Sequence, residues 1–228
     1  MDPQHRDRMA FVRICSGKFE KDMLVHHPRM GRAVRMTRPH RLFARERDTA
    51  TEAFPGDVIG LSNPGLFAIG DTVCTGEVFE FPRLPTFPPE CFAILHNQTL
   101  SKSKHLNAGL AQLREEGIVH VFYALDQMRR EPILAAVGEL QFDVVAARLA
   151  SEYGVETSIE PLPYMMAKWV EAPAPVLGQV SWLQSLRVRD AQARLVVLFS
   201  SAWEFNYIAE HNPLLRFTDA GGNSSPLA

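Results

Sequence analysis

The chain has 228 residues, a formal charge of −2 and the apolar and charged fractions of an ordinary soluble protein, enough for one large or two modest domains. Its longest apolar runs, about five residues each, are far short of the roughly 20 that span a bilayer, and its first residues lack the apolar core of a secretion signal. Cys15, Cys74 and Cys91 are scattered without a CxxC pair, which argues against a disulfide framework. We therefore expect a cytoplasmic protein with no membrane partner.

Residues 1–84 predict a small β-barrel domain, because short apolar-polar alternations are separated by turn signals and no helical period occurs. The predicted strands cover residues 9–15, 23–26, 33–36, 58–61, 66–69 and 72–75. The polar stretch 39–57 predicts a loop that ends in the turn signal Pro55-Gly56-Asp57. Residues 81–90 then hold four prolines, which indicates a stiff linker and a domain boundary at 84/85.

Residues 85–220 predict an α/β domain, and its clearest unit is 132–160. An apolar run at 133–137 predicts a buried strand, and from Glu139 the apolar residues recur at helical spacing. Gly154 follows the last apolar position and predicts the helix end, after which 155–160 alternates as a strand. The apolar helix positions are Phe142, Val145, Leu149 and Tyr153, widened by Leu140 and Val144.

The same strand-helix-strand order precedes this unit at 91–96, 101–116 and 118–123. Two such units in tandem predict a split β-α-β layer of helices on an antiparallel sheet. Next comes a predicted strand at 165–170. It is followed by another strand-helix-strand series, with a strand at 193–199, a helix at 202–211 and a strand at 214–217. Residues 221–228 predict a disordered tail. In the last helix, Trp203, Phe205 and Tyr207 are interpreted as core aromatics.

No sequence motif for catalysis, nucleotide binding or a metal site is found: the chain has no P-loop, GxSxG, HExxH or GxGxxG. His26 and His27 are adjacent, so in a strand they point to opposite faces, and we interpret them as exposed histidines rather than metal ligands. Two carboxylate pairs, Glu115-Glu116 and Glu139/Asp143, are interpreted as solvated helix ends rather than acid-base groups.

A run of arginines is the sharpest feature outside the predicted cores. Residues 29–47 contain a single carboxylate, Glu46, and seven arginines. These are Arg29, Arg32, Arg35, Arg38, Arg41, Arg45 and Arg47. Guanidinium groups bind phosphates bidentately, so part of the run is a candidate RNA-backbone contact; the alternative is a β-edge kept soluble by charge. Lys102, Lys104 and His105 form a weaker second candidate patch.

Several motifs in order resemble the bacterial translational GTPases, and within them the peptide chain release factor 3 branch. The superfamily motifs are EAFPGDVIGL (52–61), IGDT (69–72) and AVGELQFDVVAARL (136–149). The branch-specific motifs are the first 23 residues, the FDVV at 142–145 and SEYGVE (151–156). The resemblance covers about residues 1–170 well and the remainder loosely.

The resemblance implies a β-barrel that packs on an N-terminal G domain, followed by an α/β domain, both of which touch the small ribosomal subunit. It implies a factor that promotes departure of codon-reading release factors after peptide release. The G domain has no counterpart here, so GTP and Mg²⁺ are expected only with that domain and no cofactor is expected in this chain. We expect ribosomal RNA, ribosomal protein and the G domain as partners, with no DNA, and interpret the sequence as a fragment rather than a natural short form.

Two other functions stay open from the residues. One is a stand-alone phosphatase of the split β-α-β type, although the loop HNQTLSKSKH (96–105) lacks the arginine that an anion-binding loop needs. The other is a non-ribosomal binding module that adds a partner strand to an open barrel edge.

Overall fold

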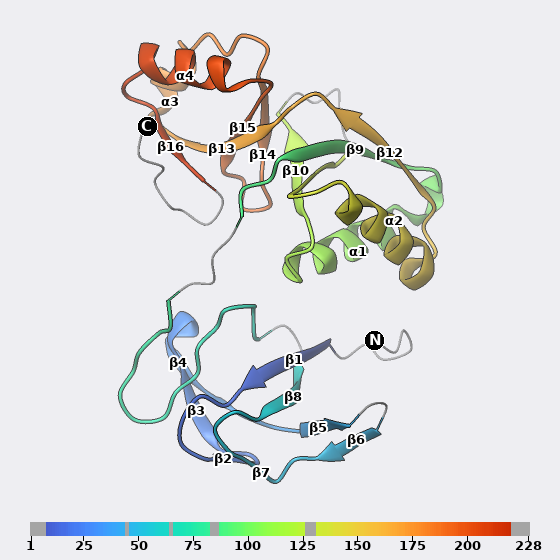
Figure 1. Cartoon of the computed structure of the whole chain (residues 1–228), viewed down its shortest axis with the longest axis vertical. Coiled ribbons are helices and arrows are strands. Elements are labelled where there is room, and N and C mark those ends of the chain that lie inside the picture. The colour runs from blue at the N-terminus through green and yellow to red at the C-terminus, as the bar shows by residue number, and fades with distance from the viewer. Residues whose placement is uncertain (1–7, 44–45, 64–65, 83–86, 126–130, 220–228) are drawn as a thin grey trace. The chain divides into compact units, whose positions relative to one another are not determined.

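The computed structural model describes residues 8–43, 46–63, 66–82, 87–125 and 131–219. The chain divides into two compact units, Met1–Leu84 and Pro85–Ala228 (Figure 1). The tail predicted at 221–228 lies outside the described residues. No helix in the described ranges is long and apolar enough to cross a membrane.

In its described residues, unit 1 consists of strands and a 3₁₀ turn at Pro28–Met30. The strands are β1 (Arg8–Arg13), β2 (Phe19–Glu20), β3 (Leu24–His27), β4 (Arg32–Arg35), β5 (Pro39–Phe43), β6 (Glu46–Thr49), β7 (Glu52–Ala53) and β8 (Val58–Asn63). They form a sheet of order β1-β8-β5-β6 and two antiparallel pairs, β2-β7 and β3-β4. Phe19, Met36, Ile59 and Leu61 lie buried in one core between them.

The polar stretch 39–57 is not the predicted loop, because it contains β5, β6 and β7. β5 pairs with both β6 and β8, and it begins at Pro39, the position where a strand tolerates a missing N–H. Antiparallel strands with one solvated face carry polar residues on that face, so a polar stretch does not by itself indicate a loop.

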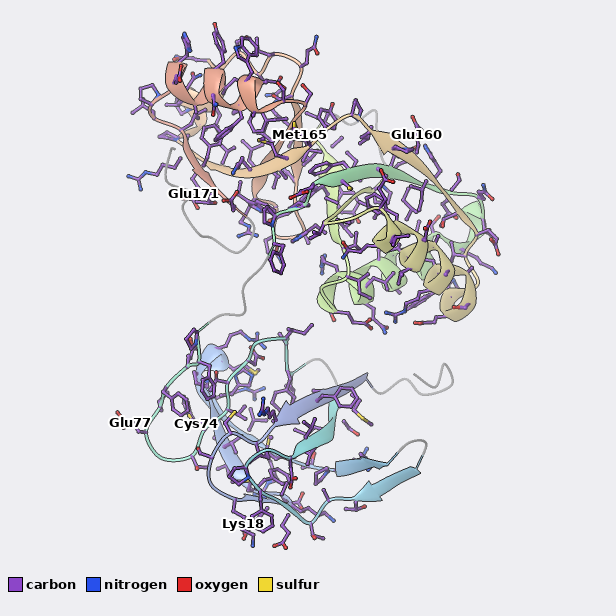
Figure 2. The ribbon with its side chains drawn as sticks, in the orientation of Figure 1. Lys18, Cys74, Glu77, Glu160, Met165 and Glu171 are labelled. Carbon is purple, nitrogen blue, oxygen red and sulfur yellow. The ribbon has the colours of Figure 1, made fainter. Side chains whose placement is uncertain are left out.

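The strands predicted at 66–69 and 72–75 are also absent from the described structure. Leu66 to Ala68 is coil that leads into a turn, and Cys74, labelled in Figure 2, makes one isolated bridge to His26. This segment is held by hydrogen bonds from Arg29 to the carbonyl of Leu66 and from the N–H of Ala68 to Asp71, rather than by a strand ladder.

Unit 2 contains one eight-stranded antiparallel sheet of order β12-β9-β11-β10-β14-β15-β13-β16. Its strands are β9 (Cys91–Asn97), β10 (His120–Ala124), β11 (Ile133–Ala136), β12 (Thr157–Leu162), β13 (Met166–Glu171), β14 (Leu186–Arg189), β15 (Leu195–Phe199) and β16 (Arg216–Thr218). Its helices are α1 (Ser103–Glu115), α2 (Leu140–Tyr153), α3 (Ala174–Leu177) and α4 (Ala202–His211), with a 3₁₀ turn at Leu100–Lys102. The predicted split β-α-β layer is confirmed.

The topology of this unit repeats itself. From β9 to β12 the chain runs β-α-β-β-α-β, and the same series runs from β13 to β16 with the same spatial order of strands. The second strands of the two halves, β10 and β14, pair and join the halves into one sheet (Figure 1). The last strand-helix-strand segment is therefore the end of a second complete split β-α-β unit.

Both halves bury their central strands on two faces. In β11, Leu134 and Ala136 belong to the core under α1 and α2, whereas Ile133 and Ala135 belong to a second core shared with β13, β14 and β15. Side chains alternate between the two faces of a strand, so a strand buried on both sides has a continuous apolar run. This explains why 133–137 was recognisable in the sequence.

Helix α2 confirms the predicted period but buries a narrower face. Phe142, Val145 and Leu149 are buried, whereas Leu140 is 78% exposed and Val144 46% exposed. Gly154 ends the helix with φ of 63°, a conformation that costs a residue with a Cβ more than it costs glycine.

The prediction that the aromatic residues of α4 lie in the core is right for Phe205 and wrong for Trp203 and Tyr207. Phe205 packs on Phe199 and Phe217, but Trp203 is 68% exposed and stacks on Tyr207 at a centroid distance of 5.3 Å. The helix turns Ile208 towards the sheet, so positions 203 and 207 fall on the outer face.

A glycine allows α1 to approach α2 closely. A Cβ at Gly109 would lie 2.6 Å from Cδ2 of Leu149, whose side chain is buried in the core. Gly109→Ala should therefore lower the free energy of unfolding by about 1–3 kcal/mol through overpacking, although glycine-to-alanine changes inside helices ordinarily stabilise. Urea unfolding followed by circular dichroism measures the change.

Gly138→Ala is the matched control, because a Cβ there meets nothing within 4 Å. It should change the stability by less than about 0.5 kcal/mol. A Gly109→Ala variant as stable as the control would contradict the close packing of α1 on α2.

Candidate nucleic-acid interface

The arginine run begins on the hairpin of β3 and β4. The two strands pair from Leu24↔Arg35 to His27↔Arg32, and the turn between them closes at Gly31 with φ of 62°. The hairpin buries Val25, His27 and Val34, whereas Arg32 and Arg35 are exposed.

Arg29 is held by the barrel. Its Nε donates to Oδ1 of Asp71 at 2.6 Å, and its Nη2 donates to Oδ2 of Asp71 at 2.7 Å and to the carbonyl of Leu66 at 2.9 Å. The hydrogen bonds to Asp71 outweigh burial and raise the pKa of the guanidinium. This bidentate pair uses the donors that a phosphate would need, so Arg29 belongs to the fold rather than to a free cationic surface.

Asp71 is the centre of a network that the sequence did not predict. Its side chain is 8% exposed and also accepts from the N–H of Ala68 at 2.7 Å and lies 3.0 Å from Nε2 of His27. Burial alone would raise the pKa of Asp71, but the bonds from Arg29 and Ala68 and the nearby positive charge outweigh it and lower the pKa.

The expectation of exposed histidines is wrong for His27, which is fully buried and stacks on Phe67. His26 points away from it and pairs through its backbone with Cys74. The described residues contain no group of three or more His, Cys, Asp or Glu side chains that could hold a metal ion.

Arg32, Arg35 and Arg38 are exposed. Arg35 donates to the backbone carbonyl of Asp22 at 3.1 Å, and Arg38 has a φ of 49°. Within the described part of the chain, none of the three forms an ion pair with a carboxylate. The hairpin and the residues directly after it therefore present three guanidinium groups to solvent.

For the remaining arginines of the run, the structure describes at most the backbone position. Arg41 lies in β5 opposite Asp48, and Arg47 lies in β6 opposite Leu42. Arg45 and the side chains of Arg41 and Arg47 lie outside the described structure. Lys18, another cation of unit 1 that is labelled in Figure 2, is paired with Glu20 and Glu52 at 3.2 and 2.8 Å.

The second candidate patch, in unit 2, is divided between structural and exposed residues. Lys102 donates through Nζ to the carbonyl of Gly154 at 2.7 Å and so satisfies a backbone acceptor at the end of α2. Lys104 and His105 are exposed in the first turn of α1.

The helix-end carboxylates differ from one another. Glu139 and Asp143 are exposed, as expected. Glu116, at the C-terminal end of α1, instead forms an ion pair with Arg148 of α2. The hydrogen bonds that Arg148 donates to Glu152 and to Glu116 outweigh burial and raise the pKa of its guanidinium. The interpretation of Glu116 as a solvated helix end is wrong.

Two further buried carboxylates were missed. Glu204 accepts from the backbone N–H groups of Gln184 and Ser200, and Asp190 accepts from the indole of Trp169 at 2.9 Å. The sequence contained a signal for Glu204, because a serine three residues before a glutamate is the capping-box pattern of a helix N-terminus. In the structure the Ser201 hydroxyl accepts from the backbone N–H of Glu204. No comparable local pattern marks Asp190.

Comparison with known proteins accounts for both units. Residues 81–209 match the family described as Class II release factor RF3, C-terminal domain, and residues 1–76 match Elongation factor G domain 2. The first match covers more than half of the chain. The chain belongs to the class II release factor RF3 family. The resemblance that the sequence motifs indicated is thereby confirmed.

Curated relatives named peptide chain release factor 3 are similar over almost the whole chain. The protein of Gloeobacter violaceus (strain ATCC 29082 / PCC 7421) is 54% identical over 219 residues, which cover 95% of this chain and 41% of the relative. The protein of Nostoc punctiforme (strain ATCC 29133 / PCC 73102) is 51% identical, with 96% and 40% covered. This RF3-family chain thus spans about two fifths of the length of these relatives.

A solved structure from Thermus thermophilus shares the fold of this RF3-family chain. It aligns with a TM-score of 0.57 at 20% identity and covers 80% of this chain and 28% of the solved one. The match supports the observed order of a β-barrel domain followed by an α/β domain.

Asp71→Asn should destabilise unit 1 of this RF3-family chain by about 1–3 kcal/mol, because it weakens hydrogen bonds between charged groups in a nearly buried site. Since the pKa of Asp71 is lower in the folded state, its contribution is complete above about pH 5 and is lost as the pH falls through the folded pKa. Urea unfolding at a series of pH values measures both effects.

Glu77→Gln, at an exposed carboxylate of the same unit, is the control and should leave the stability and its pH dependence unchanged. An Asp71→Asn variant with the pH profile of the unchanged chain would show that the Arg29–Asp71 pair contributes nothing.

Lys102→Gln should lower the stability of unit 2 by about 0.5–1.5 kcal/mol, because a carbonyl at the end of α2 loses its charged donor. Lys104→Gln, two residues away and exposed, should leave stability unchanged. Thermal unfolding of the two variants distinguishes the roles, and equal melting temperatures would refute a structural role for Lys102.

Proposed function

We propose that this chain is the ribosome-binding portion of a peptide chain release factor 3, which promotes the dissociation of codon-reading release factors from the ribosome in translation termination. In this proposal the chain supplies contacts to the small ribosomal subunit, through ribosomal RNA and ribosomal protein. GTP hydrolysis, with its Mg²⁺, belongs to a G domain that packs on the barrel in the full-length factor. This chain itself carries no catalysis.

The observation that carries the proposal is the pair of family matches, one on each unit. The similarity to proteins named peptide chain release factor 3 extends over 95% of the chain and therefore includes both units and the residues between them. A phosphatase or an unrelated binding module would not require this combination of two units.

The exposed arginines supply a physical basis for RNA contact. Arg32, Arg35 and Arg38 come from one hairpin and its continuation, and they lack carboxylate partners among the described residues. A guanidinium placed on a phosphate releases condensed counterions, and this release gives nucleic-acid binding its steep dependence on salt. Arg29 is excluded from this set because Asp71 occupies it.

The test is binding of the chain to purified small ribosomal subunits, measured by sedimentation between roughly 50 and 200 mM salt. Replacement of Arg32, Arg35 and Arg38 by glutamine should weaken binding and reduce the slope of log affinity against log salt by about 2 to 3, because three phosphate contacts are lost.

Two controls separate the site from general charge. The triple lysine variant at the same positions keeps the charge and should retain most of the salt slope, and Arg216→Gln, at an exposed arginine of unit 2, should leave it unchanged. Binding that is indifferent to salt, or a glutamine triple variant that binds as the unchanged chain does, would refute the role of these arginines.

A further inference from the structure

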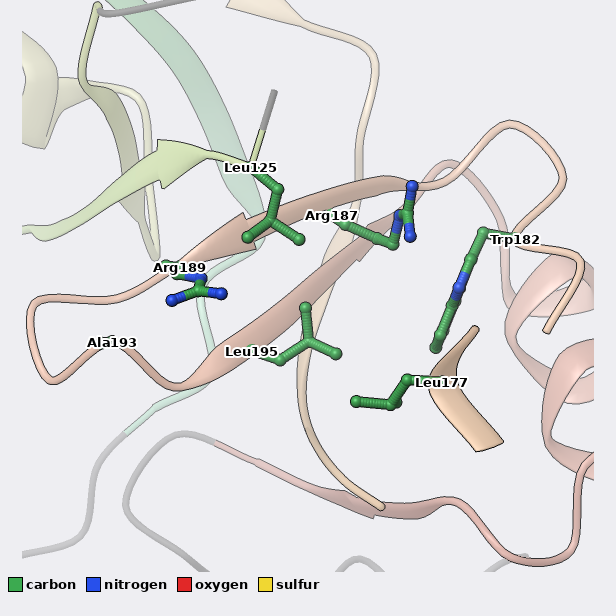
Figure 3. Close-up of a pocket in the computed structure, with 7 residues that line it drawn as sticks. All are labelled: Leu125, Leu177, Trp182, Arg187, Arg189, Ala193 and Leu195. Carbon is green, nitrogen blue, oxygen red and sulfur yellow. The ribbon is translucent and has the colours of Figure 1, made fainter. Parts of the chain in front are cut away.

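A cavity of about 160 Å³ lies in unit 2 and is lined mainly by residues of its second half. Its apolar walls are Leu125, Leu177, Trp182 and Leu195 (Figure 3). A space of this size accepts one ring-sized or side-chain-sized group, whereas drug-sized ligands and cofactors occupy about 300–1,000 Å³.

The polar groups of the cavity are donors. Arg187 and Arg189 lie two residues apart on β14 and so on the same face of the sheet, where Arg189 is opposite Leu195 of β15 (Figure 3). Both are exposed, and neither side chain forms an ion pair or hydrogen bond with another residue in the described ranges. The indole N–H of Trp182 is buried and has no hydrogen-bond partner among the described residues.

The backbone around the cavity is strained at two positions. Ala193, in its lining, has a φ of 62°, and Leu183, next to Trp182, has a φ of 50°. Left-handed conformations are uncommon for residues with a Cβ and cluster at binding sites, where surrounding packing maintains them. Leu183 is also 49% exposed.

We propose that this cavity is a docking site for a partner protein, which inserts one large apolar side chain and places flanking carboxylates on Arg187 and Arg189. The apolar walls remove the inserted side chain from water, and the two guanidinium groups at the rim form charge-assisted hydrogen bonds with the carboxylates. Tryptophan and arginine around a small pocket are also the residues that dominate binding energy in protein interfaces.

A peptide fits the site better than a nucleotide does. A base with its sugar needs more room than one side chain, and Trp182 is buried in the wall, so its ring is not an open platform on which a base can stack.

The experiment is a titration of the ¹⁵N-labelled 228-residue chain with the peptide acetyl-Gly-Glu-Phe-Glu-Gly-amide. The three tryptophans give three indole signals, assigned by triple-resonance spectroscopy, so Trp182 reports on the cavity directly. We expect a saturable shift of the Trp182 signal, with those of Trp169 and Trp203 unchanged. Arg187→Gln and Arg189→Gln should each weaken binding about tenfold, because each removes one charge-assisted hydrogen bond.

Three controls make the test specific. The peptide with glutamine in place of both glutamates should bind at least about tenfold more weakly, Arg216→Gln should bind as the unchanged chain does, and a single-stranded oligouridylate should leave the Trp182 signal in place. No saturable shift at millimolar peptide, equal binding of the glutamine peptide, unaffected arginine variants, or a shift produced by the oligonucleotide alone would each overturn the proposal.

Discussion

The buried carboxylate of Asp71 is the interaction on which the arrangement of the basic hairpin depends. It receives two hydrogen bonds from Arg29, one from the backbone of Ala68 and a contact from the ring of His27. One acidic residue thereby attaches the coil at 66–74 to the hairpin of β3 and β4. The same interaction occupies the guanidinium donors of Arg29, whereas Arg32, Arg35 and Arg38 are exposed and form no ion pair with a carboxylate among the described residues.

Unit 2 follows a different constraint, the burial of sheet strands on both faces. Each split β-α-β half places helices on its outer face, and the inner faces share one core of residues such as Ile133, Trp169 and Leu198. Because β10 pairs with β14, the two halves form one continuous sheet. Interaction surfaces are then left to the outer residues of β14 and α4, where exposed arginines and aromatic rings occur.

Local periodicity carried most of the fold that could be predicted from the sequence. The spacing of Phe142, Val145 and Leu149 located α2, and the apolar run at 133–137 located β11. Features set by distant pairing were not predictable in this way. His27 and Asp71 are 44 residues apart, Arg148 and Glu116 are 32 apart, and the polar strands β5 to β7 depend on partners elsewhere in the barrel. In the candidate site, the sequence identified the cationic residues, whereas only the structure separated a paired arginine from exposed ones.

The most direct test of the account is arginine modification with phenylglyoxal, read by mass spectrometry, with and without small ribosomal subunits. The account predicts that Arg32, Arg35 and Arg38 react in the free chain and are protected in the complex. Arg29, although its side chain is 51% exposed, should react slowly in both states because Asp71 binds it. Equal reaction of Arg32, Arg35 and Arg38 in the free and bound chain would contradict the account.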